Sequence, residues 1–256
     1  MLINKLFNKP ARNNVTVFDD DTFLISYPRS GNTWIRFLLG SIIHKTDVNW
    51  KNMEEYVPDI YRNTNKQLKN VPRPRILKSH HPYDYRYPKV IYIVRDVRNV
   101  FLSYYKFKMK MNGYSQSIEE FYYDFVHGTL DDFGSWGDNV NSWLDKSECV
   151  KGGFLLLKYE DMRSNTIMEV QKILKFLGIN RTEDEIIGCI DNASLKKMRS
   201  AEKKVSKDIE LFKSSDQSIP FVGSGLITPQ YDEKTEVLMH KLENIYSITL
   251  NSLGYI

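Results

Sequence analysis

The chain has 256 residues, with 36 Lys plus Arg against 32 Asp plus Glu, a formal net charge of +4. No linker rich in Pro, Gly or Ser and no block of one charge divides it, which favours a single domain over residues 1–256. The mild positive excess suits a small polyanionic ligand. Because nucleic-acid-binding domains are usually more strongly basic, we expect no nucleic-acid partner.

Cysteine, histidine and apolar patterns exclude several other classes. The two cysteines, Cys149 and Cys189, form no CxxC pair, and the five histidines show no HExxH spacing, so no metal site is predicted. Residues 1–13 lack the apolar core of a signal peptide, and no run of about 18 apolar residues occurs. We therefore expect a reduced, cytoplasmic chain with no membrane partner.

Short apolar runs alternate with amphipathic stretches along the chain. This alternation predicts an α/β fold with a central parallel sheet flanked by helices. Ligands of such sheets bind beyond the carboxyl ends of the strands. The predicted strands are Phe23–Tyr27, Ile76–Lys78, Val90–Val94 and Phe154–Leu157. Four helices are predicted. The first follows the first strand and has apolar positions from Trp34 to Ile42, and the second covers Asn99–Lys108. The third runs from Ile167 to Leu177, with Gly178 after it, and the fourth covers Glu233–Leu253.

The turn after the first predicted strand has the chemistry of a phosphate-binding loop. Gly31 lets the backbone approach an anion, and the N–H groups at the helix start, from Ser30 to Trp34, favour negative charge. Arg29, Ser30 and Thr33 add side-chain donors. The nucleoside-triphosphate pattern G-x-x-x-x-G-K-[ST] is absent, which argues against a kinase or ATPase. The alternative interpretation is an ordinary capped strand–helix turn.

The same turn carries a family resemblance. Tyr-Pro-Arg-Ser-Gly-Asn-Thr-Trp, residues 27–34, resembles the 5′-phosphosulfate loop of sulfotransferases that use 3′-phosphoadenosine 5′-phosphosulfate (PAPS), usually Tyr-Pro-Lys-Ser-Gly-Thr-Thr-Trp. Arg29 replaces Lys and keeps its charge, and Asn32 replaces Thr. The resemblance covers roughly Phe23 to Tyr255 and points to a short, bacterial-like member of the cytosolic type. It implies PAPS as cosubstrate, 3′-phosphoadenosine 5′-phosphate (PAP) as product, and no metal.

Further segments resemble the nucleotide-binding motifs of that family. The run from Val94 to Tyr105 resembles the 3′-phosphate motif, which implies that Arg95 and Ser103 bind this phosphate. Tyr159 matches a tyrosine that contacts the nucleotide. Ser194 and Leu195 match a segment that contacts adenine, where Leu195 replaces Phe and implies weaker stacking; Trp34 offers another aromatic face.

The resemblance is weakest near the C-terminus. Ser224 and Gly225 match a nucleotide-binding segment, but Gly223 stands where the family has Arg. This departure predicts a thinner 3′-phosphate site. The lysines that we consider as replacements for the lost charge are Lys203, Lys204, Lys207 and Lys213.

The segment Lys78-Ser79-His80-His81-Pro82 resembles the catalytic motif of the family. The resemblance implies that Lys78 and His80 are the catalytic pair, with His80 as base toward the acceptor and Lys78 and Arg29 stabilising charge on the leaving phosphate. His81 is the competing candidate for the base.

These features predict an enzyme that transfers a sulfuryl group to a hydroxyl or amine of a small-molecule acceptor, with a natural product as first choice. A glycan or a peptide tyrosine is an alternative acceptor. A small-molecule or nucleotide kinase on a related scaffold, or a non-catalytic nucleotide-binding module, is the alternative function. The chain is expected to be a monomer or a homodimer.

Overall fold

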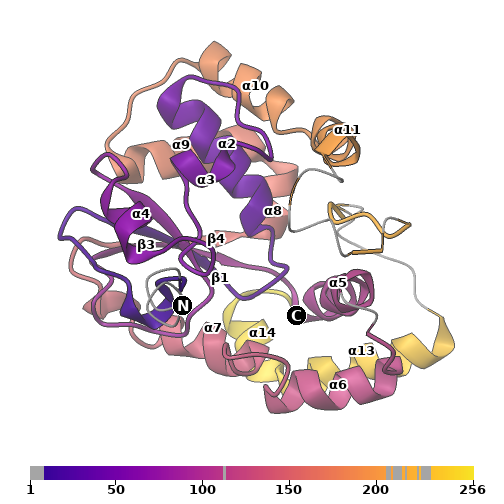
Figure 1. Cartoon of the computed structure of the whole chain (residues 1–256). Helices are drawn as coiled ribbons and strands as arrows, with labels where there is room; N and C mark the ends of the chain where they lie inside the picture. The colour runs from indigo at the N-terminus through magenta and orange to yellow at the C-terminus, as the bar shows by residue number, and fades with distance from the viewer. Residues whose placement is uncertain are drawn as a thin grey trace, which may run out of the picture.

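A four-stranded parallel sheet lies at the centre of the computed structural model, which describes residues 9–111, 114–205, 209, 215–216, 218–223, 225 and 232–256 (Figure 1). The strand order is β2-β1-β3-β4, and Phe23 pairs with both Leu77 and Val90. The strands are β1 Thr22–Ser26, β2 Ile76–Ser79, β3 Lys89–Val94 and β4 Phe154–Lys158. The predicted parallel sheet is thus confirmed.

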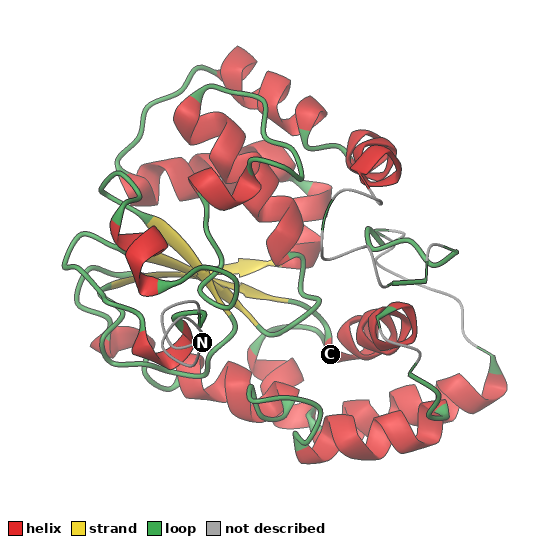
Figure 2. Ribbon diagram, viewed as in Figure 1, coloured by secondary structure: helices red, strands yellow, loops and turns green. Residues whose placement is uncertain are grey.

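Helices cover both faces of this sheet, as Figure 2 shows. One face carries α2 Asn32–His44, α3 Met53–Tyr56, α8 Tyr159–Ser164, α9 Thr166–Leu177, α10 Glu183–Asn192 and α11 Leu195–Val205. The other carries α4 Asn65–Lys69, α5 Val97–Lys110, α6 Ile118–His127, α7 Trp136–Leu144, α13 Glu233–Ile245 and α14 Ser247–Ser252. Two 3₁₀ turns, Arg12–Asn14 and Ser147–Cys149, complete the described elements. None of the described helices is long and apolar enough to cross a bilayer.

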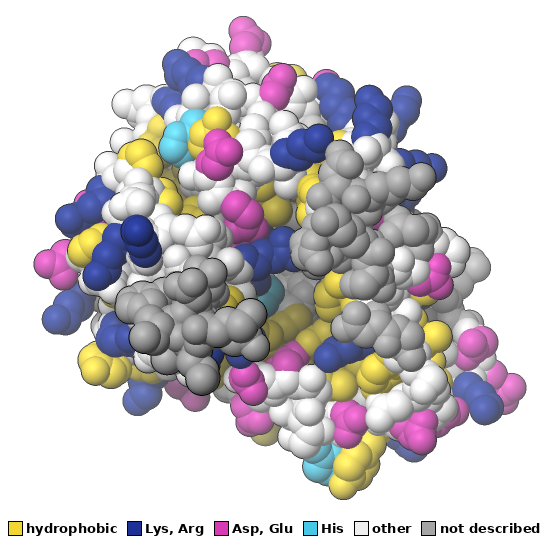
Figure 3. Space-filling model, in the orientation of Figure 1, with side chains coloured by type: hydrophobic (Ala, Val, Ile, Leu, Met, Phe, Trp, Pro, Cys, Tyr) yellow, Lys and Arg dark blue, Asp and Glu magenta, His cyan; other side chains and the backbone are white. Residues whose placement is uncertain are grey.

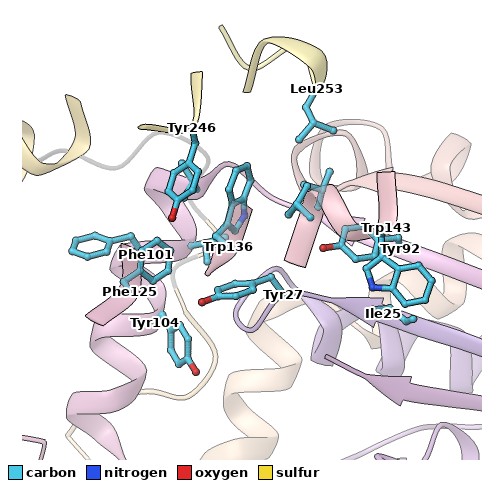
Figure 4. Packing of buried hydrophobic residues seen from close by; sticks show 14 of the residues in the cluster. Ile25, Tyr27, Tyr92, Phe101, Tyr104, Phe125, Trp136, Trp143, Tyr246 and Leu253 are labelled. Carbon is cyan, nitrogen blue, oxygen red and sulfur yellow. The ribbon is translucent and has the colours of Figure 1, made fainter. Parts of the chain in front are cut away.

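The central residues of β1 and β3 are apolar because each face of these strands packs against its own helical layer. In β1, Phe23 and Ile25 belong to the core under α5 to α7, whereas Leu24 belongs to the core under α2 and α9. All five side chains of β1 are buried. The core on the α5–α7 side is rich in aromatic rings, with Tyr27 edge-on to Phe125 (Figure 4).

The predicted C-terminal helix differs from the structure. We expected one helix over Glu233–Leu253, but α13 ends at Ile245 and α14 begins at Ser247. The Tyr246 ring packs edge-on to Trp136 at 5.2 Å between ring centroids and lies directly over Gly137. The bend at Tyr246 accommodates this packing while residues of both helices stay in one core.

One predicted helix end is confirmed and one predicted start differs from the structure. Gly178 ends α9 in the left-handed conformation, with its N–H bonded to the carbonyl of Leu174. The helix expected from Asn99 begins earlier, at Val97, because Asp96 is its N-cap and the Asp96 carboxylate accepts the Arg98 N–H. Arg98 also pairs with Asp96 and with Glu243 of α13.

Candidate active site

A cavity of about 600 Å³ opens at the carboxyl ends of the strands. The loops after β1, β2 and β3 meet there, together with α5 and residues 219–223. Parallel strands bring these loops to one edge of the sheet, which is where such folds bind ligands. Figure 3 shows the hollow, with Lys, Arg and His side chains exposed inside it.

The loop after β1 has a backbone shaped for an anion. Arg29 and Gly31 both have positive φ, 69° and 98°, and α2 begins directly after Gly31. A Cβ at Gly31 would lie 2.4 Å from Cδ2 of Tyr159, so the turn and its packing both require glycine. The buried hydroxyl of Ser30 has no hydrogen-bond partner within the described chain. This loop therefore offers an unused donor and a helix N-terminus, which fit a phosphate-bearing group.

Two arginines lie side by side at this loop. The Arg29 Nε donates to the Ser103 hydroxyl at 3.2 Å, and its Nη2 donates to the Phe221 carbonyl at 3.0 Å. Arg95 Nη1 donates to the Arg29 carbonyl at 3.1 Å, and its guanidinium lies 4.4 Å from the centre of the Tyr159 ring. Burial, and then the charge of Arg95, lower the pKa of Arg29 to about 10. An anion between these groups would relieve their repulsion, so the site fits a polyanionic ligand.

His80 follows β2 directly, and one of its ring nitrogens is hydrogen-bonded to the backbone. Its Nδ1 is 2.6 Å from the carbonyl oxygen of Ser26. Because a carbonyl only accepts, Nδ1 carries the proton and Nε2 is left as an acceptor. Burial, and then the charge of Lys78, lower the pKa of His80 well below its usual value, so the imidazole is neutral near pH 7.

His81 has different surroundings. Its Nδ1 is 3.2 Å from the Tyr87 hydroxyl, its carbonyl accepts the Trp143 indole N–H, and burial lowers its pKa to about 4. It does not line the cavity, whereas His80 does. The structure therefore brings only one of the two competing histidines to the cavity.

Most of the predicted site residues line this one cavity. Ser30 is buried within the loop and Ser194 lies elsewhere, so neither is among the lining residues, and Ser224, Lys207 and Lys213 lie outside the described residues. The predicted residues that line it are Arg29, Gly31, Asn32, Thr33, Trp34, Lys78, His80, Arg95, Ser103, Tyr159, Leu195 and Gly225.

Sequence motifs missed several residues of the site. Lys203 and Lys204, considered as replacements for the missing Arg, do not line the cavity; Arg199 does, and it donates to the Val222 and Gly223 carbonyls. Asp59, which lines the cavity and binds Lys78, also went unnoticed. Neither Arg199 nor Asp59 belongs to a phosphate motif, and only tertiary contacts reveal them. Within the described residues, no group of three or more His, Cys, Asp and Glu side chains is arranged to hold a metal ion.

Comparisons with known proteins identify the family of this chain. The family model of the sulfotransferase domain matches residues 19–254. Sulfotransferase 1 family member D1 of Mus musculus is 31% identical over 247 residues, covering 89% of this chain and 82% of the relative. Human sulfotransferase 2A1 is 30% identical and covers 75% of this chain and 70% of its own length.

Solved structures share the fold. The mouse sulfotransferase SULT7A1 complexed with PAP gives a TM-score of 0.71 at 21% identity, covering 97% of this chain and 90% of that chain. Retinol dehydratase in complex with androsterone and the inactive cofactor PAP gives 0.69 at 19% identity, covering 90% of this chain and 81% of that chain. The domain match spans nearly the whole chain and includes the loops that form the cavity, and the chain belongs to the sulfotransferase family.

Proposed function

We propose that this chain, acting as a single domain, transfers a sulfuryl group from PAPS to a hydroxyl or amine of a small-molecule acceptor, with His80 as the base. The observation that carries the proposal is the hydrogen bond between His80 Nδ1 and the Ser26 carbonyl. This bond sets the tautomer, and the ring lines the cavity, which supports Nε2 as the proton acceptor. A neutral imidazole accepts a proton without first losing one.

The cosubstrate supplies an activated sulfuryl group on a phosphate leaving group. The loop after β1, with Arg29, the unpaired hydroxyl of Ser30 and the N–H groups at the start of α2, would hold the 5′-phosphosulfate end. Arg95 and Ser103 would hold the 3′-phosphate. The PAP present in the structures of SULT7A1 and retinol dehydratase supports this choice of nucleotide.

Charge on the leaving phosphate oxygen would be stabilised by Lys78 and Arg29. Both cations line the cavity that contains His80. Lys78 is buried and Arg29 is partly buried, which strengthens their effect on a nearby anion. In the proposed in-line displacement, His80 would accept the proton of the acceptor while these cations stabilise the charge on the leaving phosphate oxygen.

Aromatic side chains favour a small acceptor beside His80. The ring centroid of Phe133 lies 5.3 Å from that of His80, and the ring centroid of Tyr61 lies 6.1 Å from it; both rings line the cavity. Flat aromatic walls beside the His80 imidazole suit a small ring-bearing alcohol, phenol or amine, such as a natural product. A relative that is 32% identical, from Cavia porcellus, is a 3-beta-hydroxysteroid sulfotransferase, which supports a hydroxyl acceptor.

The test compares His80→Ala with His81→Ala, a neighbouring histidine outside the cavity. We measure PAP release from PAPS with a panel of phenols, sterols and amines, together with PAP affinity. His80→Ala should lose about 10²–10⁴-fold in turnover while PAP affinity stays within about twofold, because a base acts only on the acceptor. His81→Ala should stay within about tenfold of wild type. Turnover that survives in His80→Ala would rule out this base.

A further inference from the structure

The segment from Pro58 to Tyr61 runs beside the end of β2 as a short parallel extension of the sheet. The Lys78 N–H donates to the Pro58 carbonyl at 2.9 Å, and the Ile60 N–H donates to the Lys78 carbonyl at 3.2 Å. This bridge pairs Asp59 directly with Lys78. The backbone alone therefore places a carboxylate next to the lysine of the Lys78/His80 pair.

Both oxygens of the Asp59 carboxylate accept hydrogen bonds from other residues of the protein. Asp59 Oδ2 accepts from Lys78 Nζ at 2.9 Å, and Oδ1 accepts the Tyr61 N–H at 2.9 Å. Asp59 and Lys78 are only 6% and 7% exposed. Glu54 fixes the segment further by accepting the Asp59 N–H at 2.8 Å. Asp59 is thus a counter-ion of Lys78 and is not free to bind an acceptor.

Tyr61, two residues on, contacts both members of the pair. Its ring centre lies 4.9 Å from Lys78 Nζ, and the ring stacks on His80 at 6.1 Å with an interplanar angle of 18°. The Tyr61 hydroxyl accepts the His80 backbone N–H at 3.1 Å. One short segment therefore fixes the lysine and the histidine together.

We propose that Asp59 is a positioning residue for sulfuryl transfer: it keeps Lys78 protonated and directed at the nucleotide site while Tyr61 holds His80 in register. This inference rests on the proposed function of Lys78. A buried ammonium without a carboxylate partner pays a large desolvation cost and loses its proton more easily. The charged and titratable groups that face Lys78 are Arg36 of α2, Glu54 of α3, Asp59, Tyr61 and His80.

Electrostatics agree with this geometry. Burial lowers the pKa of Lys78, and Asp59 is the largest effect that opposes the lowering. Burial raises the pKa of Asp59, but the charges of Lys78 and Arg36 together with the hydrogen bonds from Lys78 and Tyr61 outweigh it and hold that pKa at about 2. Asp59→Asn removes the opposing charge, so the pKa of Lys78 should fall further and free enzyme should lose that proton at a lower pH.

The experiment is calorimetric titration of the full chain with PAP in buffers of different ionisation enthalpy, from roughly pH 7 to 9.5, a range below the usual pKa of lysine. In Asp59→Asn, PAP binding should be accompanied by uptake of a proton by Lys78. This uptake should increase as the pH rises, because Lys78 is then neutral in more of the free variant and becomes protonated beside the bound anion. Wild type should show less uptake, limited to groups such as Arg29, whose pKa of about 10 also rises when an anion binds, so the excess in Asp59→Asn belongs to Lys78. Asp59→Asn combined with Lys78→Met should abolish it, and Asp59→Glu should restore wild-type behaviour. A purely structural role for Asp59 would not change proton uptake.

The matched control is Asp84→Asn. Asp84 also pairs with a cation, Arg86, in the loop that follows His81, but it does not line the cavity. It should match wild type in proton uptake and in PAP affinity, whereas Asp59→Asn should bind PAP about three- to tenfold more weakly above pH ~8. Identical uptake in wild type and Asp59→Asn would overturn the inference.

Failure of the proposed function would look different, because wild type itself would not bind PAP. If Asp59→Asn does not fold, comparison of wild type with Lys78→Met replaces it. The inference then requires equal proton uptake by these two proteins, since Lys78 stays charged in free and bound wild type. Uptake that depends on Lys78 in wild type would contradict it.

Discussion

Individual residues decide whether the loop after β1 can form. Gly31 combines φ of 98° with contact against the Tyr159 ring, so a methyl group there meets backbone strain and a clash at once. Gly188 of α10 has open space around its Cα and a helical backbone, which makes it the matched control.

Gly31→Ala should destabilise the fold by roughly 1–3 kcal/mol and weaken PAP binding, because the loop must shift to relieve the strain. Gly188→Ala should instead raise stability by up to about 1 kcal/mol. Chemical denaturation followed by PAP titration checks both variants. Unchanged stability and PAP affinity in Gly31→Ala would show that the loop does not need this conformation.

The site residues that could be predicted from the sequence are those that lie within a recognisable motif. Arg29, His80 and Arg95 each follow a predicted strand and Lys78 ends one, all within recognisable motifs, and the structure brings all four to one cavity. Asp59 has no such motif around it. Its place beside Lys78 depends on a backbone bridge between segments 19 residues apart, which periodicity does not predict.

At the scale of elements, α5 and α11 hold the segment of residues 218–223 over the cavity. Glu202 of α11 accepts the Phe221 and Val222 N–H groups at 2.6 and 3.0 Å. Lys110 of α5 donates to the Asp216 and Ile219 carbonyls at 2.9 and 2.6 Å and lies 4.0 Å from Glu202. These two buried charged groups fix the backbone of a segment that has no helix or strand of its own.

Glu202→Gln should weaken PAP binding about tenfold, because an amide accepts these N–H groups less strongly and leaves the charge of Lys110 unbalanced. Calorimetry at one pH measures the change. Glu148→Gln, at an exposed position distant in sequence from this segment, should bind PAP like wild type. Equal affinity in Glu202→Gln and wild type would show that this segment does not contribute to the nucleotide site.

Elements with strong periodicity were predictable, whereas their ends and connections were not. The four strands and α9 agree with their apolar patterns to within a residue or two. The break between α13 and α14 depends on Tyr246 packing against Trp136 of α7, a contact between helices far apart in the chain. Local sequence carries no information on such a contact.

At the scale of the whole molecule, the sheet separates two cores and its carboxyl edge presents the site between them. Residues of β1 and β3 alternate between the cores, so the loops that follow these strands are anchored on both sides. Arg29 and Arg95 therefore reach one cavity from rigid supports, and Arg95 Nη1 donates to the backbone carbonyl of Arg29 at 3.1 Å. A preorganised pair of this kind favours a ligand with more than one phosphate group.

The most direct test is calorimetric titration of wild type and Arg95→Ala with PAP, adenosine 5′-phosphate and ATP plus magnesium. The account predicts that wild type binds PAP about 10–100-fold more tightly than adenosine 5′-phosphate, without metal, and that Arg95→Ala loses most of this difference, since one charge-assisted contact contributes roughly 1.5–3 kcal/mol. Preference for ATP and magnesium, or equal affinity for the two adenosine phosphates in wild type, would contradict it.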